Sequence, residues 1–182
     1  GNPNAQAKKL LSFLSLHTAD QYILNGDIID GWSLKRGTRW KRSHTKVVKK
    51  FIELSKTHDV IYIRGNHDDF LDQYVPMKFG EIKILSKFKF HDQIQYLVVH
   101  GDLFDSVTTN APWIAKLGGF LYDQLLFINR LLKKFGLKKS FSKWIKHKVK
   151  MSVNHMSSFE RHLAEHTIEN GCGAIICGHI HH

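Results

Sequence analysis

The sequence YILNGDIID, residues 22–30, joins a short apolar run to a turn that carries two carboxylates. The apolar run predicts a short buried strand over residues 22–24, because Gly26 interrupts it and Asp27 follows directly. A carboxylate at the end of a buried strand is costly unless another group or a cation pairs with it. This stretch therefore predicts a strand and, at its carboxyl end, a polar site whose other members come from elsewhere in the chain.

Three later stretches repeat the arrangement of an apolar run, a glycine and a polar residue. They are VIYIRGNHD at 60–68, YLVVHGD at 96–102 and AIICGHIHH at 174–182. Ligands bind at the carboxyl ends of the strands in open α/β sheets, so we expect the polar residues of all four stretches to converge. The candidate ligands beside Asp27 are Asn66, His100, His179 and His181.

The order of the other elements favours an α/β fold. Apolar and alternating patterns predict strands at residues 60–63, 82–85, 87–91, 95–99 and 174–177. Helical spacing predicts a helix capped by Asn4 and a second helix that begins at Ser43 or Thr45 and ends near Lys56. The first helix is expected to turn four apolar side chains inward: Leu10, Leu11, Phe13 and Leu14.

The charge of the chain favours an anionic partner. With 27 Lys and Arg against 16 Asp and Glu, the formal net charge is +11 at pH 7. Phosphate-bearing substrates, acidic membrane surfaces and nucleic acids are all compatible with this charge. The length of 182 residues suits one domain with a substantial core, and no apolar run approaches the roughly 18 residues of a membrane-spanning helix.

Residues 110–170 differ from the rest of the chain, because nearly all of them follow a helical pattern. We expect a helical insertion between the third and fourth motifs, long enough to cap the site, so that residues 1–109 and 171–182 form the core. The basic residues of the chain that are candidate substrate contacts are Arg64, Lys143, Lys146, His147 and Lys150. The alternative is that the basic residues of the insertion form a solvated helix face.

The candidate ligands suit divalent metals of the Mn, Fe or Zn type, because Ca and Mg prefer shells made only of oxygen. A single carboxylate, Asp27, can bridge two cations. Two metals about 3.5–4 Å apart clamp a phosphoryl oxygen and generate hydroxide near neutral pH. His67 follows Asn66 and is expected to face the substrate, while Asp30 is expected to orient that imidazole and raise its pKa.

Each motif by itself is weak, because a Gly-Asp pair often forms a turn and an Asn-His pair is usually structural. All four in this order, each after an apolar run, are difficult to obtain by chance. Together GDIID (26–30), GNHD (65–68), HGD (100–102) and GHIH (178–181) resemble the calcineurin-like metallophosphoesterase superfamily. The longer stretches 26–32 and 177–182, with the insertion between them, look like its UDP-2,3-diacylglucosamine pyrophosphatase-like branch.

The resemblance covers essentially the whole chain and implies a layered αββα sandwich with a cap of helices. It also implies two divalent metal ions, with manganese as the first choice and iron or zinc as alternatives. Asp27 would bridge both ions. Asn66, His100 and His179 would complete the second metal site, and His181 would belong to the first.

The resemblance further implies that His67 is the catalytic imidazole and that Asp30 supports it. The chain departs from the family pattern in two places. The superfamily's Asp-x-His motif at the end of the first strand is absent, so the first strand is missing and the first metal site keeps only Asp27 and His181. The lipid A pathway enzymes carry Arg where this chain has His67, and His is the general phosphoesterase choice.

The ends of the chain lead to one more expectation. The sequence begins on Gly1 without a Met and stops on His182 directly after a motif. We therefore expect an N-terminally truncated fragment that binds one metal well and the other poorly, and that has little activity of its own.

Three functional hypotheses follow. The first is a metal-dependent phosphoesterase that uses a metal-activated water to cleave a phosphoanhydride or phosphoester. Its expected substrate is the pyrophosphate of a UDP-sugar lipid of the UDP-2,3-diacylglucosamine type, in lipid A biosynthesis. This enzyme would be cytoplasmic and peripheral on the anionic inner membrane face. The second is another phosphodiesterase or a nuclease of the superfamily, and the third is a catalytically dead basic module that binds membranes or nucleic acid.

Overall fold

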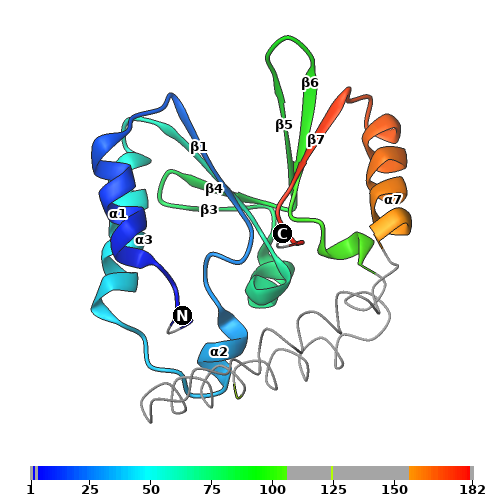
Figure 1. The fold of residues 1–182 in the computed structure, drawn as a ribbon. Helices are drawn as coiled ribbons and strands as arrows, with labels where there is room; N and C mark the ends of the chain where they lie inside the picture. The colour runs from blue at the N-terminus through cyan, green and yellow to red at the C-terminus, as the bar shows by residue number, and fades with distance from the viewer. Residues whose placement is uncertain (1, 3, 106–123, 125–155, 181–182) are drawn as a thin grey trace, which may run out of the picture. The chain divides into compact units, whose positions relative to one another are not determined.

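The computed structural model describes residues 2, 4–105, 124 and 156–180 of the chain. These residues form a mixed α/β fold with two sheets, which confirms the predicted fold class (Figure 1). The chain divides into two compact units: Gly1–Asp102 with His166–His182, and Leu103–Glu165.

The first sheet contains β1 (Gln21–Asn25), β2 (Asp59–Ile63), β3 (Met77–Phe79) and β4 (Ile82–Leu85), in the spatial order β1-β2-β4-β3. The pairs β1–β2 and β2–β4 are parallel, whereas β3 is antiparallel to β4. In the register of β1 and β2, Asn25 lies opposite Ile63. The two loops that follow these strands therefore leave the sheet side by side.

The second sheet contains β5 (Lys87–His91), β6 (Gln95–Val99) and β7 (Ala174–Cys177), in the order β5-β6-β7. The strands β5 and β6 form an antiparallel pair, and β6 and β7 are parallel. Because Val99 lies opposite Cys177, His100 and Gly178 also emerge next to each other. Both sheets thus bring polar loops to the carboxyl ends of parallel strands.

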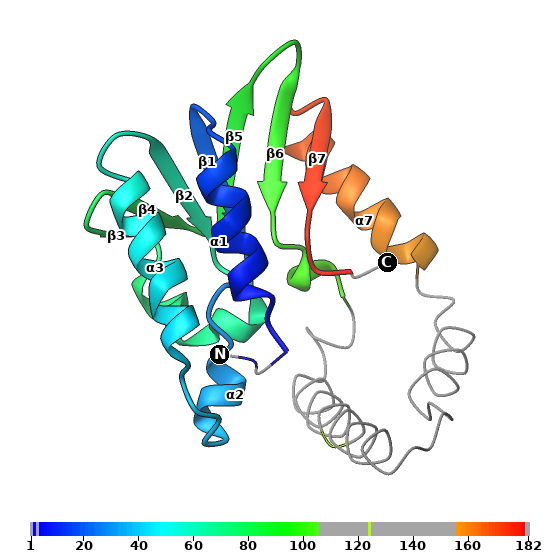
Figure 2. The same ribbon diagram turned by 60° about the vertical axis from the view of Figure 1, so that its left-hand side comes forward.

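Two helices cover the outer face of the first sheet. Figure 2 shows α1 (Ala7–Leu16) and α3 (Arg42–Leu54) beside each other there. The other helical segments are α2 (Gly31–Lys35), the 3₁₀ segments η1 (Asn66–Tyr74) and η2 (Asp102–Phe104), and α7 (Met156–Glu169). Among the described residues, no helix has the length and hydropathy that crossing a membrane requires.

The alternation of side chains along β2 builds two cores. Val60 and Tyr62 pack with α1, α3 and β4 on one face. Ile61 and Ile63 pack on the other face with Val98 of the second sheet. Burial of each such aliphatic side chain contributes about 1.5–3 kcal/mol. Within this unit the layers are therefore helices, first sheet and second sheet.

The predicted strands at 82–85, 87–91, 95–99 and 174–177 are confirmed with the same bounds. The prediction that Leu10 and Phe13 point inward is wrong, because 39% of Leu10 and 55% of Phe13 are exposed. The inward stripe of α1 instead begins at Ala7 and passes through Leu14. The prediction that Asn4 caps this helix is also wrong, since the helix begins after Gln6.

Most of the predicted insertion, 110–170, lies outside the described residues. The same holds for His181 and for the candidate substrate contacts Lys143, Lys146, His147 and Lys150. The described end of the insertion is helix α7, which buries Phe159 and Leu163. The boundaries of the insertion and the roles of these residues stay predictions.

Candidate active site

The turn after β1 aims a carboxylate across the neighbouring loop. Gly26 and Asp27 both have left-handed backbone conformations, with φ of +76° and +55°. Such a conformation is costly for an aspartate, at roughly 1–2 kcal/mol, and in native proteins strain of this kind concentrates at functional sites. In this conformation, Asp27 Oδ1 accepts a hydrogen bond of 2.9 Å from the backbone N–H of His67 in the loop after β2.

Two glycines make the close approach of these loops possible. A Cβ atom on Gly65 would lie 2.3 Å from Asp27 Oδ1 and 3.0 Å from His100 Nε2. A Cβ atom on Gly26 would lie 2.0 Å from His100 Nδ1. A larger residue at either position would displace the side chains of the site, which gives a physical reason for the glycine in these motifs.

His100 connects the second sheet to the site. Its Nδ1 lies 3.1 Å from the backbone oxygen of Asn25, and a carbonyl only accepts, so Nδ1 carries a proton. Its Nε2 lies 3.2 Å from Asn66 Oδ1 and 3.4 Å from Asp27 Oδ2. Three ligating atoms from three separate strands thus converge on one point, as the sequence predicts.

The charges of this cluster are set by competition between burial and pairing. Burial lowers the pKa of His100, but the hydrogen bond with Asp27 and its charge outweigh that effect and hold the pKa above its usual value. Burial raises the pKa of Asp27, but the hydrogen bonds from His100 and from His67 N–H hold it below its usual value. His100 and Asp27 therefore each stabilise the charged form of the other, at the place where a metal ion would bring its own positive charge.

The chemistry of these atoms fits one divalent ion. Ligands about 2.1 Å from an ion and at right angles to each other lie about 3 Å apart, close to the observed 3.2 and 3.4 Å. Asp27, Asn66 and His100 would hold such an ion. In the described part of the chain, no group of three or more His, Cys, Asp and Glu side chains could hold a metal. The set proposed here has only two such residues, Asp27 and His100, and its third ligand is the amide oxygen of Asn66.

His179 lies beside this cluster. Its backbone N–H and that of Gly178 donate to the backbone oxygen of His100, at 2.9 and 3.0 Å. The rings of His179 and His100 make an edge contact, with their centroids 5.2 Å apart. The structure thus brings together Asp27, Asn66, His100 and His179, while His181 lies outside the described residues.

The imidazole of His67 is held by a carboxylate and an indole. Its Nδ1 lies 3.1 Å from Asp30 Oδ1, and the ring of Trp32 stacks on it with centroids 4.2 Å apart. Asp30 is itself fixed as the cap of α2, because its carboxylate accepts hydrogen bonds from the N–H and the hydroxyl of Ser33 at 2.8 and 2.6 Å. The ring of His67 is therefore oriented, with Nε2 left for other partners.

Asp30 also sets the charge of His67. Burial lowers the pKa of His67, but its hydrogen bond to Asp30 and the charges of the nearby carboxylates outweigh burial and raise it. For Asp30, burial raises the pKa, but the hydrogen bonds from His67 and Ser33 hold it well below its usual range. The predicted contact and the predicted direction of the His67 shift are both present, whereas its catalytic role stays a prediction.

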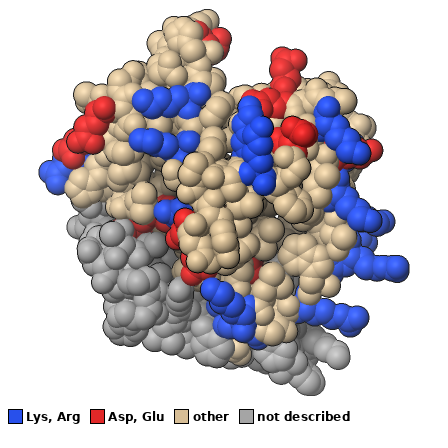
Figure 3. Space-filling view, turned by 180° about the vertical axis from the view of Figure 1, so that it is seen from behind, with Lys and Arg blue, Asp and Glu red and all other residues tan. Residues whose placement is uncertain are grey.

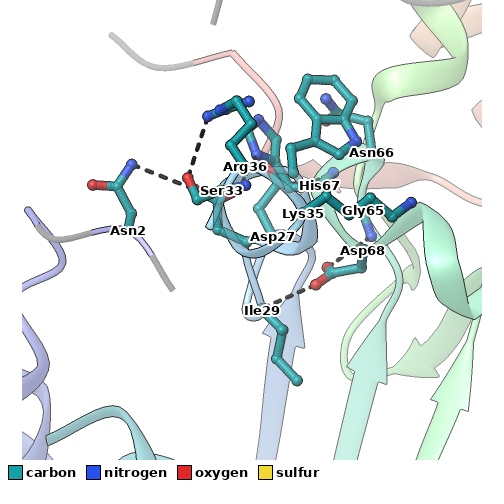
Figure 4. Close-up of polar contacts among 12 residues, drawn as sticks. Asn2, Asp27, Ile29, Ser33, Lys35, Arg36, Gly65, Asn66, His67 and Asp68 are labelled. Carbon is teal, nitrogen blue, oxygen red and sulfur yellow. Dashed lines mark hydrogen bonds and ion pairs between the residues drawn. The ribbon is translucent and has the colours of Figure 1, made fainter. Parts of the chain in front are cut away.

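Asp68 is a residue to which the sequence analysis gives no role. It is fully buried and accepts a hydrogen bond from Tyr62 OH at 2.6 Å. It also accepts hydrogen bonds from Ile29 N–H at 2.9 Å and Gly65 N–H at 3.1 Å (Figure 4). It thereby ties the loop after β1 to the loop after β2. The available signal is its spacing, since Asp68 lies three positions after the N-cap Gly65, where an acidic side chain often accepts from the N-cap N–H.

Arg64 is occupied by carboxylates of the protein. Its Nε lies 3.1 Å from Asp72 Oδ1, and its Nη1 pairs with Asp102 Oδ2. Asp102 belongs to the HGD motif, so this ion pair provides a structural use for the last residue of that motif. A contact between Arg64 and substrate stays a prediction.

A cleft opens next to this cluster, between the start of α1, β1 and α3. Its volume is about 430 Å³, and its lining is mainly apolar. Asp27 and Asp30 line part of it. The cleft therefore gives small groups access to the carboxylates of the site.

Comparison with known families gives one finding. The sequence model of the calcineurin-like phosphoesterase family matches residues 1–182, which is the whole length of the chain. No curated protein matches the chain significantly.

Proposed function

The chain belongs to the calcineurin-like phosphoesterase family, and we propose that it cleaves the pyrophosphate bond of a UDP-sugar lipid of the UDP-2,3-diacylglucosamine type. Membership supports the coarser function by itself: a hydrolase that acts on a phosphate-bearing substrate with the help of divalent metal ions. The lipid substrate, manganese as the metal, and a cytoplasmic location on the inner membrane face belong to the proposal.

One observation carries the proposal: His100 Nε2 lies 3.2 Å from Asn66 Oδ1 and 3.4 Å from Asp27 Oδ2, beside an imidazole that a carboxylate holds. Asp27 has a lowered pKa and remains ionised at neutral pH, so it can neutralise positive charge there. A divalent ion at this point would activate a water molecule and offset the charge of the phosphate. The protein's own contribution is to hold its ligands close together.

His67 is the proposed general acid. Asp30 accepts a hydrogen bond from Nδ1–H, and Nε2 faces away from that contact. In the protonated ring Nε2 also carries a hydrogen, which it can donate. The raised pKa keeps a larger fraction of the imidazole protonated near neutral pH. Donation of the Nε2 proton to the leaving oxygen would stabilise the charge that develops as the bond to phosphorus breaks.

The lipid part of the proposal is supported by sequence. The stretches 26–32 and 177–182 look like those of UDP-2,3-diacylglucosamine pyrophosphatases, and the net charge of +11 suits an anionic substrate. Arg64 and the basic residues Lys143, Lys146, His147 and Lys150 are the proposed contacts for phosphate groups. The same charge also suits nucleic acid, so the test must separate these two substrate classes.

The test measures Mn²⁺ binding by calorimetry and turnover with four substrates: a UDP-2,3-diacylglucosamine, the same UDP-sugar without acyl chains, a chromogenic phosphodiester, and single-stranded DNA. We expect Mn²⁺-dependent turnover that is highest with the acylated substrate. Asp27→Asn and His100→Ala should each abolish metal binding and turnover together. Activity that survives both substitutions would refute the site, and a preference for DNA would refute the lipid substrate alone.

A further inference from the structure

Helix α1 exposes apolar side chains that its packing does not need. Its inward face, which includes Ala7 and Leu14, packs on the first sheet. On the outward side, 55% of Phe13 and 76% of Leu16 are accessible. Helical geometry places Lys9 on that same side, because residues 9, 13 and 16 are separated by four and three positions. Large exposed apolar side chains that cluster on one surface commonly mark an interaction site.

The neighbouring helix adds positive charge. Helix α1 carries Lys8 and Lys9 and no acidic residue. Helix α3 carries four basic residues and a single acidic one, Glu53, which pairs with Lys50 at 3.6 Å. The remaining basic residues of α3 are all exposed: Arg42, Lys46 and Lys49. Figure 3 shows Lys and Arg side chains standing out along the side of the molecule that α3 occupies.

Because α1 and α3 lie side by side on the same sheet (Figure 2), their outward sides form one surface. We call it the α1–α3 face, and its residues are Lys8, Lys9, Phe13, Leu16, Arg42, Lys46 and Lys49. We propose that the α1–α3 face attaches the protein to the anionic surface of a lipid bilayer. Phe13 and Leu16 would enter the interface between headgroups and acyl chains, while the basic side chains would stay at the level of the headgroups.

The composition of the face favours a bilayer over nucleic acid. Phosphate groups would account for the basic residues, and a base could stack on Phe13. An aliphatic side chain such as Leu16 has no comparable role against a nucleic acid, yet it is the more exposed of the two apolar residues. An acidic bilayer uses both kinds of side chain, since it combines anionic headgroups with an apolar interior.

The charge of the face also disfavours a second copy of the chain. A symmetric dimer would place the same surface on both partners. Basic side chains would then face basic side chains across the interface, with no acidic residue on α1 and only Glu53, which pairs with Lys50, on α3. Like charges placed opposite each other across an interface are unfavourable.

This inference deepens the proposed function and rests on it in one respect: a membrane contact is useful because an acylated substrate resides in a membrane. Its evidence is separate, since no residue of the α1–α3 face belongs to the candidate active site. Vesicle binding in the absence of substrate and metal therefore tests the surface without testing the reaction.

The experiment is co-sedimentation of the full chain with vesicles of phosphatidylcholine containing about one third phosphatidylglycerol, compared with pure phosphatidylcholine. Binding should require the anionic lipid. The double variant Lys46→Gln, Lys49→Gln should bind about 25-fold more weakly, at about fivefold per lysine. Phe13→Ala with Leu16→Ala should weaken binding by at least tenfold.

Matched controls come from strand β3, where Phe79 is as exposed as Phe13, at 54%. Phe79→Ala and Lys78→Gln should bind vesicles as the unchanged chain does, and thermal unfolding should show that every variant is folded. Equal losses in the β3 and α1 variants would overturn the proposal. It would also be overturned by absence of vesicle binding, by binding to DNA alone, or by a dimer in solution that Phe13→Ala with Leu16→Ala disrupts.

Discussion

The two ends of the first sheet each carry a hydrogen-bonded aspartate, but in opposite environments. At the carboxyl end, Asp68 is fully buried and accepts hydrogen bonds from Tyr62, Ile29 and Gly65. At the amino end, Asp59 accepts hydrogen bonds from Gln21 at 2.8 Å and Lys83 at 2.6 Å, with 37% of its side chain exposed. Burial raises the pKa of Asp68, whereas the hydrogen bond from Lys83 lowers that of Asp59.

This difference in burial indicates that the functional site lies at the carboxyl end of the sheet. An exposed ion pair adds little stability and is easily replaced by water. A buried carboxylate costs desolvation free energy, which only a complete set of hydrogen bonds offsets. The carboxyl end carries such costs at Asp27, Asp30 and Asp68 together. Local violations of the usual rules of folding are expected at functional sites, and here they concentrate at one end of the sheet.

The largest expected effect is a loss of turnover from a substitution at the carboxyl end of the sheet that leaves the protein folded. His67→Ala removes the proposed general acid and should lower turnover by about 10²–10⁴-fold. Its half-buried ring is not a proposed metal ligand, so Mn²⁺ content should be unchanged. His58 lies at the amino end, just before β2, where its ring contacts Tyr22, and His58→Ala is the matched control with normal turnover expected. Metal loss in the His67 variant would make His67 a ligand instead.

The second effect concerns stability and compares the two aspartates directly. Asp68→Ala leaves two buried donors and one half-buried donor without an acceptor. We expect the unfolding free energy to fall by about 3 kcal/mol, at roughly 1–3 kcal/mol for each unsatisfied group with partial relaxation. Asp59→Ala should cost about 0.5 kcal/mol or less, because solvent screens the pair. Urea unfolding measures both. Equal costs would show that burial does not distinguish the two ends.

The third effect tests how tightly the loops at the carboxyl end must approach. In Gly65→Ala the new methyl group would lie 2.3 Å from Asp27 Oδ1, although the backbone φ of −116° suits any residue. Overpacking of this kind costs about 1–3 kcal/mol, and it should also weaken Mn²⁺ binding about 10–100-fold through the displaced ligand.

Gly80→Ala is the control for that substitution. Gly80 has a φ of +58°, and a Cβ atom added to it would meet no atom within 4 Å. Its substitution should cost about 1–2 kcal/mol in backbone strain and leave calorimetric Mn²⁺ affinity unchanged. If both alanine variants bound Mn²⁺ equally well, the close approach of Gly65 to Asp27 would have no role in the site.

The sequence was sufficient to predict the described strands other than β3 (Met77–Phe79), and the meeting of their ends. Parallel pairing of β1 with β2 brings the loops of Asp27 and Asn66 together, and that of β6 with β7 places His100 beside His179. A glycine near the end of each apolar run signals these meetings. The contact of Asp30 with His67 was also predictable. The roles of these residues in metal binding and catalysis stay predictions.

Other features depend on tertiary contacts that no local pattern contains. Asp68 acquires its role from a tyrosine hydroxyl on β2 and a backbone N–H after β1, and neither is visible as spacing. Trp32 stacks on His67 because α2 turns it there. The inward side of α1 was mispredicted because apolar residues occur on both of its sides, so Phe13 and Leu14 were indistinguishable before the packing was known.

The smallest effect is a pH dependence at the amino end. The pKa of Asp59 is below its ordinary 3.8 in the folded protein, because Lys83 and Gln21 donate hydrogen bonds to the ionised carboxylate. Its contribution is therefore fully present above the unfolded-state pKa and is lost as the pH falls through the folded-state value. Urea unfolding of the unchanged chain and of Asp59→Asn should differ by about 0.5 kcal/mol or less at pH 7, and the difference should shrink as the pH falls below 3.8. If the difference in unfolding free energy grew as the pH fell, the pKa of Asp59 would be raised in the folded protein rather than lowered. The amino end would then resemble the carboxyl end, where burial raises the pKa of Asp68.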